Sequence, residues 1–466
     1  MIFALLAAAA SALLAQETLD PALKARVDKV FAEFDKSASP GCALGIVRDG
    51  RMLYRNGYGS ANLDFRLPIT PNSIFDIGST SKQFSTMAIL LLEQDGKLKI
   101  DDDVRKYVPE LRDYGAVITI RHLLNHTSGL RDYLTLADLA LYDEDDFYTD
   151  DDVLAMIARQ KELNFAPGTD YLYSNSGFFL LSTIVKRVSG KTLRAFAEER
   201  ILKPLQMTNT HFHDDHTEIV RNRATGYAPL PGNRFKVSMS TLDMVGDGGI
   251  YTSVNDLFKW DQNFYTHKVG GADLLARMQT PSKLNDGKEL KYGLGLFVEP
   301  YRGLPTVSHG GSWAGFRAEL LRFPSEKVSV ICLCNLASTN PPQLARRVAD
   351  VVLEARFTEP VPPEPPKPPA KPVASEAKTI DRTPYLGSFA SEELGGVVYR
   401  FSPGEGSTLV LEGRHKRTLR PLGGDQFDGG RWKVQFSRES AGGPVIGFTI
   451  EAGRVRNIRF NRVQPK

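Results

Sequence analysis

The sequence predicts an α/β (α+β) fold in which helices flank an antiparallel sheet, followed by a C-terminal antiparallel β-barrel-like domain. Three observations indicate this. Runs typical of strands lie within residues 42–58 and 304–334 and bracket a mainly helical middle. A dense proline stretch follows at 360–372. From about residue 382, short alternating apolar runs are separated by glycine-rich turns, a pattern of small antiparallel domains.

The strands of the predicted sheet come from both ends of the first domain. The turn Asp49-Gly50 lies between the runs 42–47 and 52–58, which is a hairpin signal. Three further strands are predicted at 304–307, 316–323 and 328–334. We therefore expect the first and last runs to share one sheet.

The helices of the middle region are predicted from apolar residues at helical spacing. One such stripe runs from Phe84 to Leu92 and stops at Gly96. Another runs from Leu180 to Val188 and stops at Gly190. We expect these helices to lie on the faces of the sheet.

The proline stretch, PVPPEPPKPPAKP, forces extended polyproline conformations and excludes helix and sheet. We therefore place a linker at 358–381. The following residues, 382–466, predict a small barrel of lipocalin-like form, because Trp432, Val434 and Phe436 alternate with polar residues. No catalytic constellation is evident in this part of the sequence.

The amino terminus, MIFALLAAAASALL, is an apolar run followed by small residues, with cleavage expected after Ala12 or Ala15. The run is shorter than the roughly 20 residues that a membrane span needs. We predict a signal peptide at 1–15, a catalytic domain at 20–357, and an exported protein that is periplasmic or secreted.

The overall composition excludes several classes of partner. The chain has 466 residues, 42% hydrophobic and 24% charged, which suits a globular protein of two or three domains. Basic and acidic residues number 58 and 55, and the formal net charge is +3. This balance gives no electrostatic footprint for nucleic acid or an anionic membrane. No pattern indicates the oligomeric state.

Three cysteines occur, and each lies in an apolar run that predicts a strand: Cys42, Cys332 and Cys334. Cys332 and Cys334 would point to the same face of one strand, where a mutual disulfide has poor geometry. We expect buried thiols rather than disulfides or a thiolate metal site.

The first chemical motif is Ser79-Thr80-Ser81-Lys82, at the start of a predicted helix. Residues three apart share a helix face, so the Lys82 amine can reach the Ser79 hydroxyl. A serine hydroxyl is a weak nucleophile until a base takes its proton, and a lysine with a depressed pKa can be that base. A second S-x-x-K spelling occurs at 375–378, but only the first opens a long apolar helix.

The second motif is Tyr173-Ser174-Asn175, ahead of another predicted helix. A tyrosine close to a lysine can relay a proton from the nucleophile to the leaving group. The Asn175 side chain can hydrogen-bond a substrate amide.

The third motif is His309-Gly310-Gly311-Ser312, on a predicted strand. Its paired glycines, Gly310 and Gly311, let a substrate backbone approach closely. The backbone amides of Ser79 and Ser312 can then polarise the substrate carbonyl as an oxyanion hole.

In this order the motifs resemble the serine β-lactamase and penicillin-binding protein superfamily, which has S-x-x-K, S-D-N and K-T-G elements. Y-S-N in the second place is similar to class C β-lactamases, family VIII esterases, D-aminopeptidases and related DD-peptidases. The resemblance covers about residues 25–355 and includes the segments 118–130 and 248–257. It implies a β-lactamase-like fold with an all-helical subdomain.

The resemblance also implies a role for each motif residue. Ser79 is the acylated nucleophile, Lys82 its proton partner, and Tyr173 the general base and acid. The substrate contacts are Asn175, His309, Gly310, Gly311 and Ser312.

One departure from the family pattern bears on the substrate. Lactamases of this group carry Lys-Thr-Gly at the third motif, where His309 stands here. A histidine is cationic only in part near neutral pH, because its reference pKa is about 6.5. This disfavours β-lactamase and carboxypeptidase activity. It is similar to the D-aminopeptidase and esterase-like branches, some of which also have C-terminal β modules.

Two groups of histidines suggest a metal site, and we predict none. The run His211 to His216 contains three histidines and two aspartates, but its flanks indicate an exposed loop. His122 and His126 suit helix packing and a cap. A serine nucleophile with an internal proton relay needs no cofactor, and no phosphate-binding glycine loop is present.

We therefore predict a serine hydrolase that cleaves amides or esters through an acyl-enzyme on Ser79. Short peptides, D-amino acid amides and esters are the expected substrates. The alternative is a non-catalytic protein that binds penicillin or cell-wall peptides, which Ser79 labelling without turnover would indicate. Transacylation to an amine also stays open.

Overall fold

A computed structural model describes residues 19–143, 146–363 and 380–463. The predicted signal peptide, most of the predicted linker and the second S-x-x-K spelling lie outside the described residues. No helix in the described ranges combines the length and the apolar character that a membrane span requires.

The first domain is built on a six-stranded antiparallel sheet in the order β10-β11-β12-β13-β1-β2. Asp49 and Gly50 form the predicted hairpin turn, and their φ angles of 49° and 79° are those that a type I′ turn requires. The first strand pairs with the last, so the two ends of the domain do share one sheet as predicted. The strands are β1 (Cys42–Arg48), β2 (Arg51–Tyr58), β10 (Phe297–Tyr301), β11 (Leu304–Trp313), β12 (Phe316–Phe323) and β13 (Val328–Cys334).

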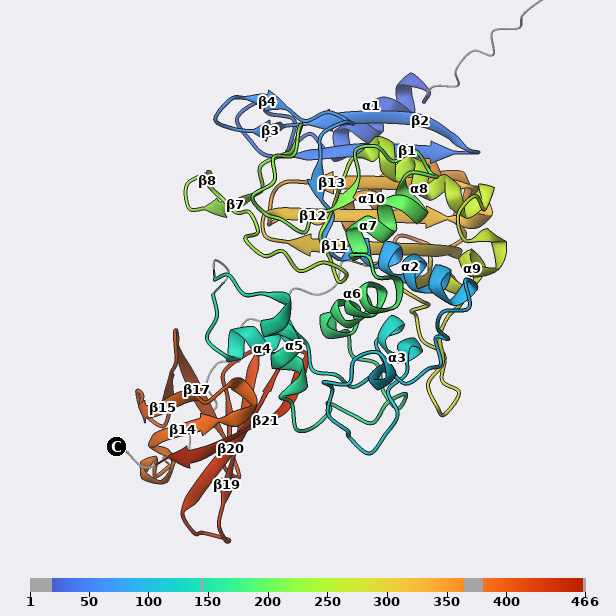
Figure 1. Cartoon of the computed structure of the whole chain (residues 1–466). Helices are drawn as coiled ribbons and strands as arrows, with labels where there is room; N and C mark the ends of the chain where they lie inside the picture. The colour runs from blue at the N-terminus through green and yellow to red at the C-terminus, as the bar shows by residue number, and fades with distance from the viewer. Residues whose placement is uncertain (1–18, 144–145, 364–379, 464–466) are drawn as a thin grey trace, which may run out of the picture.

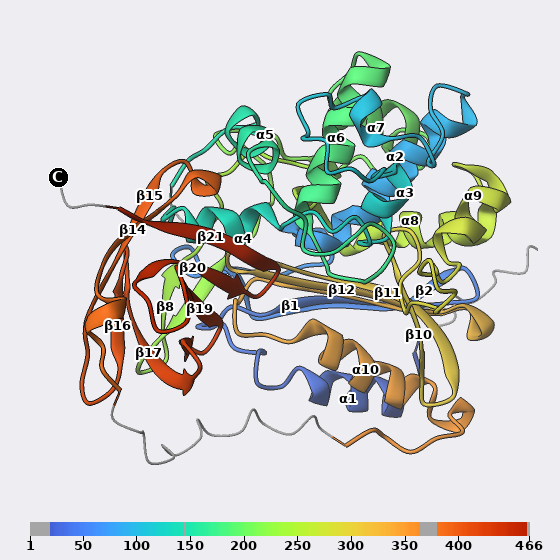
Figure 2. The ribbon, with the colours of Figure 1, turned by 90° about the horizontal axis from the view of Figure 1, so that it is seen from below.

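Helices cover both faces of this sheet (Figures 1 and 2). On one face, α1 (Pro21–Val30) and α10 (Pro341–Val352) enclose an apolar core against the strands. On the other face lie α2 (Lys82–Gln94), α6 (Asn175–Ser189) and α8 (Val254–Thr266). The predicted helix stop at Gly190 is confirmed, since Gly190 caps α6 in the left-handed conformation.

Helices α2 and α6 belong to a helical region that also contains α3 (Ile120–Leu124), α4 (Tyr133–Leu139), α5 (Asp150–Ala158) and α7 (Leu193–Ala197). This domain also contains β5 (Phe75–Asp76), the 3-10 turn η1 (Gly78–Ser81), β6 (His211–Phe212), β9 (Ile250–Thr252) and α9 (Gly271–Met278). Two short hairpins complete the strands, namely β3 (Ser60–Asn62) with β4 (Leu67–Pro68) and β7 (Tyr227–Leu230) with β8 (Arg234–Val237).

The C-terminal region is a closed antiparallel barrel, as the alternating pattern predicts. Aromatic rings fill its interior, among them Phe389, Phe401, Phe436 and Phe448. The barrel lies beside α4 and α5 (Figure 2), and the Tyr399 hydroxyl donates to the Leu139 carbonyl at 2.9 Å. Its strands are β14 (Gly387–Ser391), β15 (Val397–Pro403), β16 (Leu409–Glu412), β17 (Lys416–Gly423), β18 (Gln426–Asp428), β19 (Trp432–Arg438), β20 (Val445–Ala452) and β21 (Val455–Val463).

The expectation that all three cysteines are buried thiols is wrong for two of them. Cys42 and Cys334 form a disulfide. They occupy directly opposite positions of β1 and β13, with Cα atoms 4.0 Å apart. Cys332 is a buried free thiol. Spacing within one strand excludes the Cys332–Cys334 pair, but it contains no information about a partner 292 residues away.

Reduction of this disulfide is expected to lower the free energy of unfolding by about 2–5 kcal/mol, because the bond closes a very long loop in the unfolded chain. Urea unfolding with and without a thiol reductant measures the effect. The matched control is the double variant Cys42→Ser/Cys334→Ser, whose stability should not respond to the reductant. An equal response of both proteins would show that the disulfide contributes nothing.

Candidate active site

The Ser79 segment is fixed between the end of β5 and strand β11. The Asp76 carboxylate accepts the Gly78 N–H at 2.7 Å, and the Thr80 hydroxyl donates to the His309 carbonyl at 3.0 Å. Gly78 has φ 48°, and a Cβ there would lie 2.8 Å from the Ser312 nitrogen. The chain therefore needs glycine at this position, and the first and third motifs are in contact.

Lys82 joins the first motif to the second. Its side chain is completely buried at the start of α2. Its Nζ contacts Ser79 Oγ at 3.1 Å and Asn175 Oδ1 at 2.9 Å, and it donates to the Asp247 carbonyl. Burial lowers the pKa of Lys82 below the usual lysine value, while the charge of the Asp247 carboxylate acts in the opposite direction.

Asp247 lies in a segment that runs across the first turn of α2. Ser85 donates to the Gly246 carbonyl at 2.6 Å, and the Ile250 N–H donates to Ser81 at 3.0 Å. The Tyr133 hydroxyl donates to the Asp247 carboxylate at 3.1 Å. Asp247 was not predicted from the sequence, although this residue directly precedes the segment 248–257 that resembles the family.

Tyr173 is half-buried beside Lys82, whose Nζ lies 4.9 Å from the centre of the tyrosine ring. The Tyr173 hydroxyl is buried, and the Ser79 hydroxyl interacts with it. Burial raises its pKa above the usual tyrosine value, and this outweighs the opposing effects of Ser79 and Arg454. Tyr173 is therefore a neutral phenol that has a proton to give.

A chain of hydrogen bonds runs from His126 through Tyr292 to His309. The donors and acceptors at its two ends determine which atom carries each proton. His126 Nδ1 accepts the Ser174 N–H at 3.2 Å, so its Nε2 donates to the Tyr292 hydroxyl at 3.3 Å. That hydroxyl donates to His309 Nε2 at 3.0 Å, and His309 Nδ1 donates to the Gly310 carbonyl at 2.6 Å. This assignment requires both histidines to be neutral.

Burial agrees with that assignment, because it lowers the pKa of His309 to about 3. The third motif therefore presents no cation, where the sequence analysis expected a partly charged histidine. His126 lies in the active site, which its sequence context did not predict. Its ring packs on Tyr173 with a centroid distance of 4.0 Å.

A cavity of about 1000 Å³ opens at Ser79, Tyr173 and His309. Every predicted site residue except Lys82 lines it, and Lys82 lies directly beneath Ser79. The barrel also contributes to the wall, through Arg454. No local pattern marks Arg454, since it belongs to an ordinary glycine-containing turn between two strands.

The run His211 to His216 is not the exposed loop that its flanks indicate. His211 and Phe212 form strand β6, which pairs with β9, and His213 is buried. Among the described residues, His211, His213 and Glu218 lie close enough to share an ion. However, both oxygens of Glu218 accept from Arg194, at 2.7 and 3.0 Å, and this cation disfavours a metal there.

A serine hydroxyl on a buried lysine, beside a tyrosine whose hydroxyl is buried at a cavity wall, defines a serine hydrolase. The beta-lactamase family model matches residues 27–354, and the chain belongs to that family. The predicted resemblance is thereby confirmed, and the chain is a serine hydrolase of the beta-lactamase type.

The chain is similar to D-aminopeptidases and to a penicillin-binding protein homologue. The chain is 28% identical over 425 residues to a D-aminopeptidase of Gluconobacter oxydans, covering 91% of this chain and 76% of the relative. It is 30% identical over 296 residues to a D-aminopeptidase of Brucella anthropi, covering 64% and 56%. The chain thus spans little more than half of the Brucella anthropi protein. A solved structure, the octameric penicillin-binding protein homologue from Pyrococcus abyssi, aligns with TM-score 0.63 and 25% identity over 94% and 99%.

Proposed function

We propose that this protein hydrolyses the amide bond of D-aminoacyl amides and short peptides, and the related esters, through an acyl-enzyme on Ser79. One observation carries the proposal: the Lys82 amine contacts Ser79 Oγ and two carbonyl oxygens, from Asn175 and Asp247.

These three contacts determine how a neutral Lys82 is oriented. A neutral amine has two N–H groups and one lone pair. Carbonyl oxygens only accept hydrogen bonds, so Asn175 and Asp247 take the two N–H groups. The lone pair is then left for Ser79, whose hydroxyl donates to it. Lys82 is in this way placed as the base, and its depressed pKa favours the neutral form that a base requires.

The acylation step follows from this arrangement. Ser79 Oγ attacks the substrate carbonyl carbon while its proton passes to Lys82, and the backbone N–H groups of Ser79 and Ser312 bind the oxyanion. Tyr173 gives its proton to the leaving nitrogen as the C–N bond breaks, and it regains a proton from Lys82. Water then hydrolyses the ester on Ser79 by the same transfers in reverse.

The preference for D-configured substrates is supported by the relatives named D-aminopeptidase. The neutral His309 also disfavours the β-lactamase role, because the third motif lacks a cation. A non-catalytic binding protein is not favoured, since the groups required for proton transfer are present and in contact.

The test is hydrolysis of D-alanine and L-alanine p-nitroanilides by the purified protein, with intact mass measured after rapid quenching. We expect the D enantiomer to react at least about tenfold faster and Ser79 to carry the alanyl group. Equal rates would overturn the stereochemical assignment. Turnover that persists in Ser79→Ala would overturn the acyl-enzyme.

The proposed location is outside the cytoplasm. The Cys42–Cys334 disulfide supports it, because such bonds persist in oxidising compartments and are rare in the reducing cytoplasm.

A further inference from the structure

The turn between β20 and β21 brings a barrel residue to the active site. Gly453, with φ 54°, forms the turn, and Arg454 follows it. Arg454 lines the same cavity as Ser79, and its guanidinium carbon lies 4.6 Å from the centre of the Tyr173 ring. The barrel therefore supplies part of the active-site wall.

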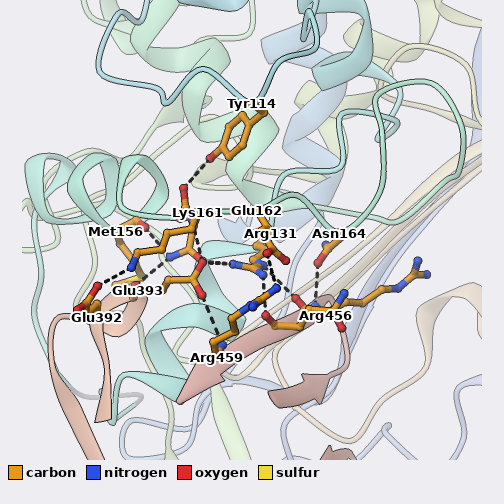
Figure 3. Close-up of polar contacts among 12 residues, drawn as sticks. Tyr114, Arg131, Met156, Lys161, Glu162, Asn164, Glu392, Glu393, Arg456 and Arg459 are labelled. Carbon is orange, nitrogen blue, oxygen red and sulfur yellow. Dashed lines mark hydrogen bonds and ion pairs between the residues drawn. The ribbon is translucent and has the colours of Figure 1, made fainter. Parts of the chain in front are cut away.

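A buried ion pair holds this turn in place (Figure 3). Arg131 and Glu393 are 0% and 3% exposed, and their side chains meet at 2.6 Å. The Arg131 guanidinium also donates to the backbone carbonyls of Arg456 and Asn457, both at 3.0 Å. One arginine of the catalytic domain thus binds the barrel in three places.

Asn164 holds the same turn from its other side (Figure 3). Its side-chain amide donates to the Arg454 carbonyl at 2.9 Å and accepts the Arg456 N–H at 2.8 Å. The catalytic domain therefore holds the backbone at Arg454 and directly after it.

Among the described arginines of the cavity wall, Arg454 is the one whose guanidinium donates no hydrogen bond. Of the other arginines in the wall, Arg317 donates to two backbone carbonyls, and Arg346 contacts Glu299 at 3.4 Å. Among the described residues, the Arg454 guanidinium makes no hydrogen bond and only a long ion pair, 3.7 Å to Asp132. The Arg454 side chain is 43% exposed.

Asp132 does not need Arg454 as a partner. One of its oxygens accepts the Asn175 N–H at 2.7 Å, and the other accepts the backbone N–H and the hydroxyl of Thr135. The donors of Arg454 therefore remain available to an anion that enters the cavity. A planar guanidinium binds a carboxylate through two parallel hydrogen bonds.

The position of Arg454 beside Tyr173 indicates which carboxylate this is. In the proposed reaction Tyr173 protonates the leaving nitrogen. If the leaving group is an α-amino acid, its carboxylate is separated from that nitrogen by a single carbon. We propose that Arg454 binds the free α-carboxylate of the leaving amino acid, so that the enzyme prefers dipeptides to aminoacyl amides. This inference rests on the proposed function.

The experiment compares D-alanylglycine with D-alanylglycinamide, which differ only in the charge of the terminal group. We expect the native enzyme to prefer the free acid by about tenfold or more, as hydrogen bonds to charged groups require. Arg454→Gln should abolish the preference for the acid, because any effect of the substitution through Tyr173 lowers kcat/KM for both substrates by the same factor. The matched control is Arg459→Gln on β21, whose guanidinium pairs with the exposed Glu162.

Equal losses on the two substrates in Arg454→Gln would overturn the proposal. Calorimetric binding to Ser79→Ala provides a readout without turnover. If Ser79→Ala binds the acid more tightly than the amide, and Ser79→Ala/Arg454→Gln does not, the carboxylate site is supported. If the native enzyme then hydrolyses neither compound, only the proposed function fails. Equal binding of acid and amide overturns the carboxylate site, even if both are hydrolysed.

Discussion

Replacing Lys82 by alanine is expected to lower kcat/KM for an amide substrate by about 10⁴-fold, because removing the base costs nearly as much as removing the nucleophile it activates. Steady-state hydrolysis of the D-alanine anilide measures the loss. Ser79→Ala gives the reference level, and Lys186→Ala, an exposed lysine on α6, is the control that should retain full activity. Less than a tenfold loss in Lys82→Ala would assign the base to another group.

The pH dependence of kcat/KM is a second test of Lys82 as the base. Lys82 accepts a proton only when neutral, so kcat/KM should rise as pH increases through its pKa. Because burial lowers that pKa, this rise is expected below pH 10.4, the value of a free lysine. The residual activity of Lys82→Ala should lack the rise. If kcat/KM of the native enzyme fell as the pH rose through this range, the result would contradict a neutral lysine base.

The second large effect is expected from Tyr173→Phe, which should lower kcat/KM for the anilide by about 10²–10⁴-fold because it removes the proton that the leaving nitrogen needs. Tyr171→Phe is the matched control, since Tyr171 lines the same cavity two residues earlier. A p-nitrophenyl ester sharpens the test, because p-nitrophenolate leaves without a proton. The ester should therefore lose much less activity than the anilide, and equal losses would argue against a role in leaving-group protonation.

The features that could be predicted from sequence are those encoded by neighbouring residues. Asp49-Gly50 predicts its own hairpin, and Ser79 and Lys82 are three apart on one helical turn, so their contact follows from spacing alone. The resemblance placed Tyr173 and Asn175 in the same site, and they do meet Lys82 there.

The features that could not be predicted depend on contacts between distant segments. Cys42 meets Cys334 only because β1 pairs with β13. Arg454 reaches the cavity only because Arg131 and Asn164 bind its turn. The proline-rich linker does not reveal this docking, since its composition sets its stiffness and not the surface on which the barrel comes to rest.

Because β1 pairs with β13, the central sheet cannot be completed until the ribosome has synthesised β13. The two strands are central neighbours in the sheet, yet 292 residues separate the cysteines that join them. At about 5–20 residues per second, a ribosome takes about 15–60 s to produce the partner strand after the first one. A chain that stops just before residue 328 contains Ser79, Lys82 and Tyr173 but not the strand that connects the two halves of the sheet. We therefore expect a chain that ends just before residue 328 to lack hydrolase activity.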